Sequence, residues 1–319
     1  MKMLDDMVRG INSVAIIGHV NPDGDCTGSC LAAYNYLKKW YPEIRAKVYL
    51  GDFSDRFLFL QGADQISHDF ADVGEYELCL SIDASDLGRL GEGVNFFERA
   101  KKTVCIDHHI TNIGFADENY IDGRASAACE LLFTMMDSEK IDLAIAECLY
   151  MGIVHDTGVF KHSNTTEQTM TIAGKLVAKG VNTSYIIDET FYRKTYVQNR
   201  LLGLALTRSC LSEDAECIYT WLNQEDMRTL GAKRKDTDGI IDQLRLTEGI
   251  ECALLLIEQE QGGYKVSMRA NSWLNVSEIC RNHGGGGHAK AAGCEIMDTV
   301  ENIVPMILAE IRAQRDAKH

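Results

Sequence analysis

The sequence has little proline and no cysteine pair of the type that holds zinc. Three prolines occur in 319 residues, so no proline-rich linker separates one segment from another. The 11 cysteines include no Cys-x-x-Cys pair. Cys79, Cys105, Cys148 and Cys252 lie within apolar runs, which is typical of reduced core residues. A zinc-binding structural protein is therefore disfavoured.

Long apolar runs and excess basic charge are also missing. No run approaches the roughly 20 residues of a membrane helix, and the first residues lack the hydrophobic region of a signal peptide. A net charge of −15 argues against a long nucleic-acid groove, because such a groove needs a basic stripe. A small anionic substrate is still allowed, since bound divalent cations invert the local field of acidic residues. We expect a cytoplasmic protein with neither a membrane nor a long duplex as partner.

The remaining composition, 45% hydrophobic and 25% charged, is typical of a globular chain with room for two domains. Short apolar, β-branched runs alternate with helical patterns, which predicts an α/β fold with a parallel sheet. We expect an N-terminal domain over 1–190, a connecting helix within 191–214 and a smaller α/β domain over 215–319. Strands are predicted near 14–18, 46–50, 78–82, 103–106, 217–222, 251–257 and 265–270. Helices are predicted near 27–40, 126–136, 142–155, 195–211 and 239–246.

Acidic and imidazole groups follow these strands or end these helices. In open α/β sheets, the edge at the carboxyl ends of the strands is where ligands bind. Pro22 and Gly24 predict that 19–25 is a turn, and 86–91 is expected to be a loop. The groups in question are His19, Asp23, Asp25, Asp83, Asp107, His108, His109 and Asp156.

Mixed carboxylate and imidazole ligands suit Mn²⁺ best, with Mg²⁺, Fe²⁺ and Co²⁺ as alternatives. There are more such groups than one ion needs, and two ions about 3.5–4 Å apart would use them and clamp a phosphoryl displacement. Taken singly, each group has an ordinary structural explanation: Asp23 and Asp25 as turn residues, Asp83 as a helix cap, His108 as a polar surface residue. Their joint occurrence at element ends favours a site.

The same residues resemble the ordered motifs of the DHH phosphoesterase superfamily, in the subfamily with a DHHA1 domain. Within it the chain is most similar to bacterial nano-RNases that also act as phosphatases of pAp (3′-phosphoadenosine 5′-phosphate). The resemblance covers essentially the whole chain. It rests on His19-x-x-x-Asp23-x-Asp25, Asp83, Asp107-His108-His109, Asp156, and Gly284-Gly285-Gly286-Gly287-His288 followed by Ala291-Ala292-Gly293.

This resemblance implies a role for each residue. His19, Asp23 and Asp83 would hold one Mn²⁺. A second ion would be held by Asp25, Asp83, His108 and Asp156, with Asp83 bridging the two. His109 would contact the scissile phosphate, and Asp107 would orient an imidazole from behind.

The glycine-rich segment is expected to bind substrate. Consecutive glycines disfavour regular structure, so Gly285, Gly286 and Gly287 are predicted to permit close approach of a phosphate, with His288 as a donor. A plain flexible loop is the alternative. Arg269 resembles a family position that reaches substrate phosphate, with a solvated arginine as the alternative. Segment 163–165 resembles a stretch that lines the catalytic cleft in relatives, although turn chemistry is the simpler explanation.

The leading hypothesis is a two-metal Mn²⁺ phosphoesterase that hydrolyses short oligoribonucleotides to mononucleotides and pAp to AMP. Substrate is expected between the two domains, and the resemblance suggests a homodimer. Cleavage of cyclic di-AMP or of the linear dinucleotide pApA is a close alternative. A hypothesis of a different class is a non-catalytic nucleotide sensor, which the full set of motif residues disfavours.

Overall fold

The computed structural model describes residues 2–71, 74–214 and 216–317. The chain forms two compact units, Met1–Arg193 and Lys194–His319, and each is considered by itself. The predicted domain limits at 190 and 214 remain predictions. Within the described residues, no helix has the length and apolar character needed to cross a membrane.

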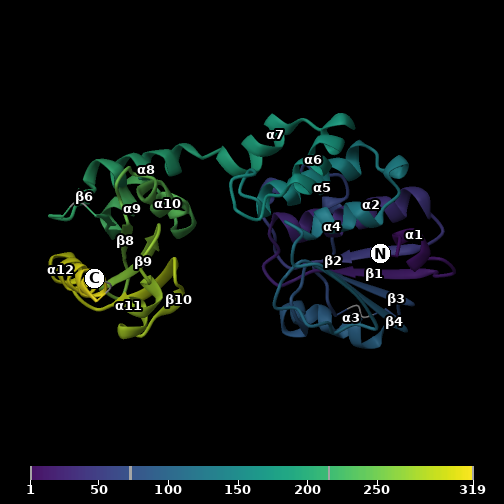
Figure 1. Cartoon of the computed structure of the whole chain (residues 1–319), viewed down its shortest axis with the longest axis horizontal. Coiled ribbons are helices and arrows are strands. Elements are labelled where there is room, and N and C mark those ends of the chain that lie inside the picture. The colour runs from purple at the N-terminus through teal and green to yellow at the C-terminus, as the bar shows by residue number, and fades with distance from the viewer. Residues whose placement is uncertain (1, 72–73, 215, 318–319) are drawn as a thin grey trace. The chain divides into compact units, whose positions relative to one another are not determined.

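The first unit is built on a five-stranded, wholly parallel sheet in the order β2-β1-β3-β4-β5 (Figure 1). Strands β1 and β3 are buried throughout, as expected for a sheet covered on both faces. The order reverses between β1 and β3, and such a switch point opens a crevice at the carboxyl ends of the two strands. The strands are β1 (Ser13–Ile17), β2 (Arg45–Tyr49), β3 (Leu78–Ile82), β4 (Lys102–Asp107) and β5 (Glu118–Ile121).

Helices cover both faces of this sheet, which confirms the predicted α/β class. The larger apolar core contains α2, α4, α5 and α6, while α3 packs in a smaller core with Ala15, Tyr49 and Cys79 on the other face (Figure 1). The helices are α1 (Leu4–Met7), α2 (Gly24–Trp40), α3 (Val94–Arg99), α4 (Ala128–Met135), α5 (Leu143–Asp156), α6 (Glu167–Ala178) and α7 (Thr183–Ile187). Short turns of other helix types are η1 (Asp55–Phe57), η2 (Ala63–Gln65), η3 (Leu87–Gly93), η4 (Ser138–Lys140) and η5 (Asp188–Tyr192).

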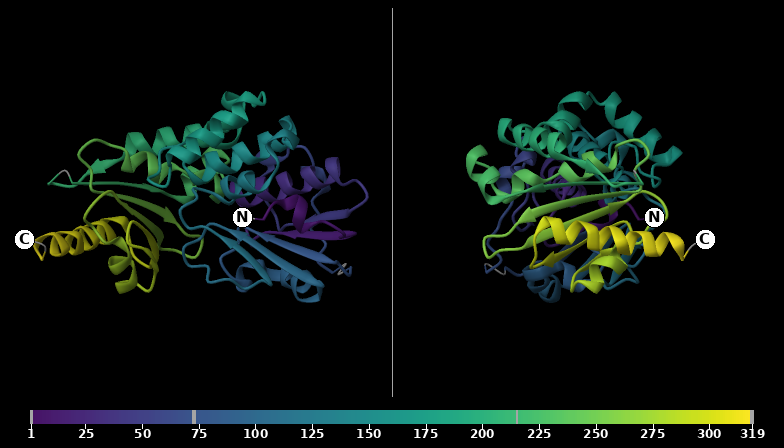
Figure 2. Two further views of the ribbon diagram at one scale, coloured as in Figure 1. Left: turned by 45° about the vertical axis from the view of Figure 1, so that its right-hand side comes forward. Right: turned by 90° about the vertical axis from the view of Figure 1, so that its left-hand side faces the viewer.

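The second unit contains a mixed six-stranded sheet in the order β10-β11-β9-β8-β7-β6. Helices α11 and α12 pack on one face, and α12 lies along it in both views of Figure 2. Helices α8 and α10 pack on the other face. The strands are β6 (Cys210–Leu211), β7 (Cys217–Leu222), β8 (Cys252–Glu258), β9 (Tyr264–Ala270), β10 (Gly286–His288) and β11 (Ala291–Ile296). The helices are α8 (Tyr196–Arg208), α9 (Gln224–Leu230), η6 (Arg234–Thr237), α10 (Ile240–Arg245), α11 (Val276–Asn282) and α12 (Val300–Asp316).

Four local predictions are wrong. Helix α2 begins at Gly24 rather than at residue 27, because the Asp23 side chain caps it. Segment 86–91 is mostly the 3₁₀ turn η3 rather than an open loop. The helical spacing of Leu31, Tyr34, Leu37 and Trp40 predicts one buried face. Trp40 instead lies 40% exposed at the end of α2, where its indole donates to the Lys140 carbonyl. The last two glycines of the run lie in a regular element, because β10 pairs with β11.

Candidate functional site

The site residues of the first unit lie at the carboxyl edge of the sheet. His19 follows β1 by two residues, Asp83 directly follows β3, and Asp107 is the last residue of β4. Asp83 has a left-handed backbone (φ 59°), which is uncommon outside glycine and costs free energy. The sheet therefore brings three separate segments to the switch point, and it holds one of them in a strained conformation.

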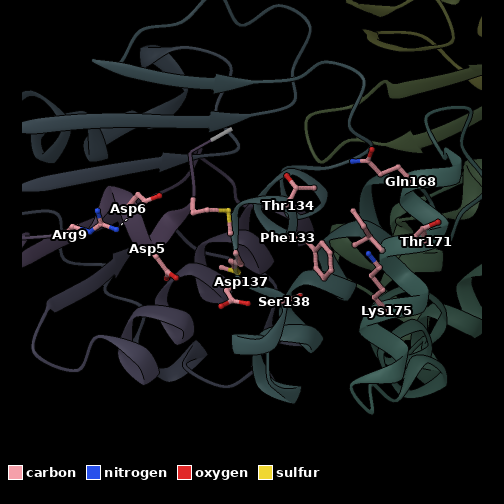
Figure 3. Close-up of a pocket in the computed structure, with 13 residues that line it drawn as sticks. Asp5, Asp6, Arg9, Phe133, Thr134, Asp137, Ser138, Gln168, Thr171 and Lys175 are labelled. Carbon is pink, nitrogen blue, oxygen red and sulfur yellow. Dashed lines mark hydrogen bonds and ion pairs between the residues drawn. The ribbon is translucent and has the colours of Figure 1, made fainter.

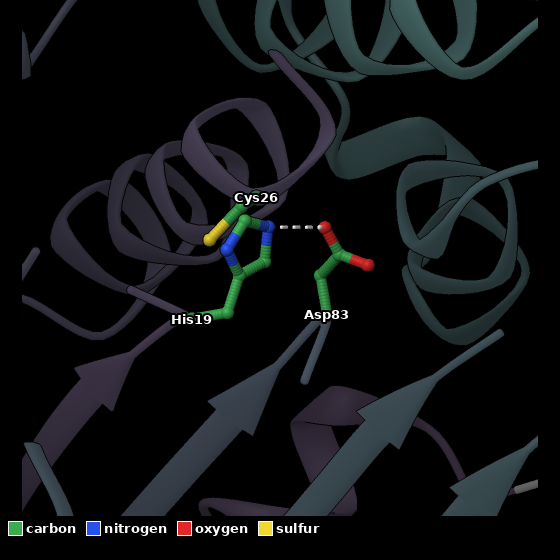
Figure 4. Close-up of side chains that lie close together, drawn as sticks. All are labelled: His19, Cys26 and Asp83. Atoms are coloured by element: carbon green, nitrogen blue, oxygen red, sulfur yellow. Dashed lines mark ion pairs between the residues drawn. The ribbon is translucent and has the colours of Figure 1, made fainter. Parts of the chain in front are cut away.

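Asp83 stands between two histidines, one on each carboxylate oxygen. Its Oδ2 lies 3.6 Å from Nε2 of His19, and its Oδ1 lies 3.5 Å from Nε2 of His108. Figure 4 shows the first of these contacts beside Cys26. Nε2 of His19 also lies 3.8 Å from Asp23 Oδ2, and Nε2 of His108 lies 3.0 Å from Asp156 Oδ2. The cluster thus has two halves that share Asp83.

Asp23 and Asp25, on either side of Gly24, are held by backbone amides. Oδ1 of Asp23 accepts from the amides of Asp25 and Cys26, which leaves Oδ2 directed at His19. The fully buried Asp25 accepts from the amides of Ala128 and Cys129 at the start of α4. Because these N–H groups have no partner within their own helix, a carboxylate there is stabilised. Helix α4 therefore fixes a side chain that belongs to α2.

The Asp107 carboxylate orients His109. Its Oδ1 lies 2.7 Å from Nδ1 of His109, and its Oδ2 accepts from the side-chain amide of Asn112 at 2.7 Å. The ring of His109 is about two-fifths exposed, whereas Asp107 is fully buried. The arrangement leaves Nε2 of His109 available for a ligand.

The protonation equilibria of these groups are strongly displaced. Burial opposes the charge on His108, yet Asp156 and Asp83 outweigh it and raise its pKa to about 12. Burial also opposes the charge on Asp23, but His19 outweighs it and lowers the pKa to about 2. Burial together with the neighbouring Asp83 and Asp156 raises the pKa of Asp25 well above its usual value. These pKa shifts of opposite sign arise because several closely spaced acids share few positively charged groups.

The residues present fit divalent cations. Oδ1 of Asp83 is buried and has no hydrogen-bond partner among the described residues, which is costly unless a cation neutralises it. Ligand atoms of Asp25, His108 and Asp156 lie within 4.8 Å of one another, as do those of His19, Cys26 and Asp83. Oxygen and imidazole donors in two such groups match the preferences of Mn²⁺, Mg²⁺ or Fe²⁺.

Sequence reasoning missed Cys26 and the support that Asn164 gives. The Cys26 thiol lies beside His19, but burial raises its pKa well above the usual value, so it is a neutral thiol. Its place directly after Asp25 was the only signal in the sequence. The side-chain amide of Asn164 donates to the carbonyls of Ser126 and Asp156, which ties the approach to α4 to the end of α5.

The expected substrate contacts other than His109 belong to the second unit. His288 of β10 pairs with Ala291 of β11, which pairs with Arg269 of β9. The Arg269 side chain lies 3.5 Å from the Asp242 carboxylate, and His288 is exposed. An added Cβ at Gly285 would lie 2.2 Å from the Gly293 carbonyl oxygen, so this glycine permits a close backbone approach.

A cavity of about 740 Å³ in the first unit contains none of the predicted site residues. It lies between the N-terminal segment, the end of α4 and α6 (Figure 3). Two acidic residues at its rim, Asp5 and Asp6, are already paired with Lys140 and Arg9. Its lining includes no histidine, so it lacks the combination of carboxylates and imidazoles gathered at the strand ends.

Comparison with known proteins also divides the chain into two parts, one matched region in each of the two structural units. Residues 13–153 match the DHH family, N-terminal domain, and residues 215–314 match the DHHA1 domain. The bifunctional oligoribonuclease and PAP phosphatase NrnA of Thermus thermophilus is 27% identical over 93% of this chain and 88% of its own length. The protein of the same name from Bacillus subtilis is 24% identical, over 92% and 93%.

A solved structure shares the whole fold. The crystal structure of an exopolyphosphatase-related protein from Bacteroides fragilis has a TM-score of 0.84, at 23% identity, over 99% of this chain and 96% of its own. The two domain matches together span most of the sequence. The chain therefore belongs to the DHH family of phosphoesterases and carries a DHHA1 domain.

Proposed function

We propose that this protein is a two-metal, Mn²⁺-dependent phosphoesterase that hydrolyses short oligoribonucleotides to mononucleotides and pAp to AMP. The observation that carries the proposal is Asp83, whose two oxygens face the two halves of one carboxylate and imidazole cluster. The resemblance to proteins named bifunctional oligoribonuclease and PAP phosphatase supports the choice of substrates.

The first unit would supply the chemical step. His19, Asp23 and Asp83 would hold one ion, and Asp25, Asp83, His108 and Asp156 the other. When bound, the ions would lower the pKa of water and neutralise charge on the phosphoryl oxygens. His109 would donate a hydrogen bond from Nε2 to the scissile phosphate. Asp107 and Asn112 would keep that ring in place, since Asp107 also raises the pKa of His109 and favours its cationic form.

The second unit would bind the rest of the substrate. Gly285, Gly286 and Gly287 carry no side chain that would keep a phosphate from the backbone, although the Gly285 N–H already donates to the Cys280 carbonyl oxygen. His288 and Arg269 would donate to the same group from one face of the sheet. The site between the domains, the homodimer and the cytoplasmic location remain predictions.

Hydrolysis under one set of Mn²⁺ conditions tests the proposal. Purified protein should release AMP from pAp and mononucleotides from RNAs of two to five residues, and chelation should abolish both activities. Parallel reactions with pApA and cyclic di-AMP rank the alternative substrates. Absence of turnover on every substrate, with Mn²⁺ binding intact in calorimetry, would instead favour a nucleotide sensor.

A further inference from the structure

One face of the second sheet continues beyond the expected phosphate contacts. Residues paired across neighbouring strands share a face, and side chains two apart along a strand return to it. His288 and Arg269 lie on this face, separated only by Ala291. The next row on the same face is Gly286, Gly293 and Ser267. Because these residues are small, the face is open from the glycine run to β9.

A cationic pocket opens at the far end of this face. It has a volume of about 630 Å³ and is lined by β8, β9, η6 and the start of α10. Its apolar part comes from Ile241, Leu255 and Ile257. Four cationic side chains and two carboxylates also line it: Arg234, Lys235, Lys265, Arg269, Asp238 and Asp242.

The cations of this pocket are largely uncompensated. Arg269 is paired with Asp242, whereas Arg234, Lys235 and Lys265 make no ion pair within residues 2–71, 74–214 and 216–317. Arg234 and Lys235 are exposed and Lys265 is half-buried. The pocket has an excess of cations in a chain whose net charge is −15. Such a local excess attracts anions.

The spacing along β9 separates the Lys265 end of this pocket from His288, while Arg269 lies at the end that the two share. Lys265 and Arg269 are four residues apart, which is about 14 Å along a strand at about 3.4 Å per residue. His288 lies across from Arg269, at the end of β9 away from Lys265, so the Lys265 end of the pocket can hold a different group from the one that His288 contacts. The apolar lining beside the cations suits a sugar or base, as in other nucleotide pockets.

We infer that this pocket binds a further phosphodiester of an oligonucleotide, beyond the phosphate that is attacked and the one held by His288. The inference rests on the proposed function. Because pAp has two phosphates, it leaves none for this pocket, whereas an RNA of several residues fills it. The cations Arg234, Lys235 and Lys265 thereby distinguish oligonucleotides from pAp.

A triple variant, R234A/K235A/K265A, tests the inference, with R228A, at an exposed arginine of α9 outside the pocket, as the control. We expect kcat/KM for a five-residue RNA to fall at least tenfold while that for pAp stays within twofold. The slope of log affinity against log salt should flatten by about 0.7 per lost phosphate contact. Equal losses on both substrates, or no loss on RNA, would overturn the inference and leave the proposed function standing.

Binding without catalysis separates the two hypotheses. Fluorescence anisotropy of a labelled five-residue RNA in EDTA measures binding without the metal-dependent reaction. If the parent protein hydrolyses neither substrate, weaker binding by the triple variant than by R228A still supports the pocket. Equal binding by the two variants overturns it. Thermal melting of each variant confirms that the fold is retained.

Discussion

The two units hold their charged groups in opposite ways. In the first, Asp25, Asp83 and His19 are 0%, 2% and 5% exposed and are ringed by other titratable groups. In the second, His288 is exposed and Arg234 lies at an open pocket with no ion pair among the described residues. Burial of charge is costly without compensation, whereas exposed charge keeps its hydration.

Under the proposed function, this difference assigns the chemical step to the first unit and substrate binding to the second. Buried and mutually constrained ligands suit a chemical step that requires fixed geometry and little water. Exposed cations suit reversible binding of anions and are screened by salt. Substitutions in the first unit should therefore change hydrolysis by orders of magnitude. Substitutions on the second should change affinity by less, with a strong dependence on salt.

The largest effect is expected at Asp83. D83A removes the carboxylate shared by both halves of the cluster, and a metal site is worth several kcal/mol to a transition state. We expect hydrolysis of pAp and of short RNA to fall by about 10³-fold or more. D52A, at an exposed aspartate, is the control and should match the parent. Retained hydrolysis in D83A would show that the buried cluster of the first unit is not needed for the reaction.

The next largest effect concerns pH and metal affinity. Metal binding must displace protons from His19, His108 and Asp25. Neighbouring carboxylates raise the pKa of the two histidines, and burial raises the pKa of Asp25. Since these pKa values are raised, the protons are held at neutral pH and binding weakens as the pH falls. We expect the Mn²⁺ dissociation constant to rise about tenfold per pH unit between pH 8 and 6 for each proton released. An affinity that does not vary with pH, measured by calorimetry, would contradict this.

A smaller loss is expected from D107N. The carboxylate lies behind His109 and not among the expected ligands, and partners of this kind typically contribute 10- to 100-fold to activity. We predict a fall of about that size in kcat, with Mn²⁺ affinity little changed. D122N, just beyond β5, is a matched Asp-to-Asn control. Equal activity of D107N and the parent would show that the Asp107 contact does not support catalysis.

The smallest effect distinguishes two neighbouring glycines of the second unit. A Cβ at Gly285 would meet the Gly293 carbonyl and Cys294, so G285A should lower the free energy of unfolding by about 1–3 kcal/mol. G286A should change it little, because no atom lies within 4 Å of an added Cβ. Urea unfolding measures both. Equal destabilisation would show that the whole run, rather than one close approach, requires glycine.

Much of the fold could be predicted because its signals are local. Buried, largely apolar runs such as 14–18 and 78–82 fall where β1 and β3 lie, since a parallel sheet covered on both faces needs continuous apolar strands. The start of α2 could not be predicted from Pro22 and Gly24, because the Asp23 cap overrides their disruption of helix. Strand β10 depends on a ladder to β11, which no local propensity encodes.

The candidate site shows the same division. The acidic and imidazole groups that follow strand ends can be identified from the order of residues, because the carboxyl ends of parallel strands share one edge. The contacts that hold each group in place come from the folding of distant segments onto one another. Helix α4 supplies the amides for Asp25, and Asn164 ties Ser126 to Asp156. These contacts join segments far apart in the chain. Their partners are backbone groups that every residue carries, so the residue types in the sequence do not reveal them.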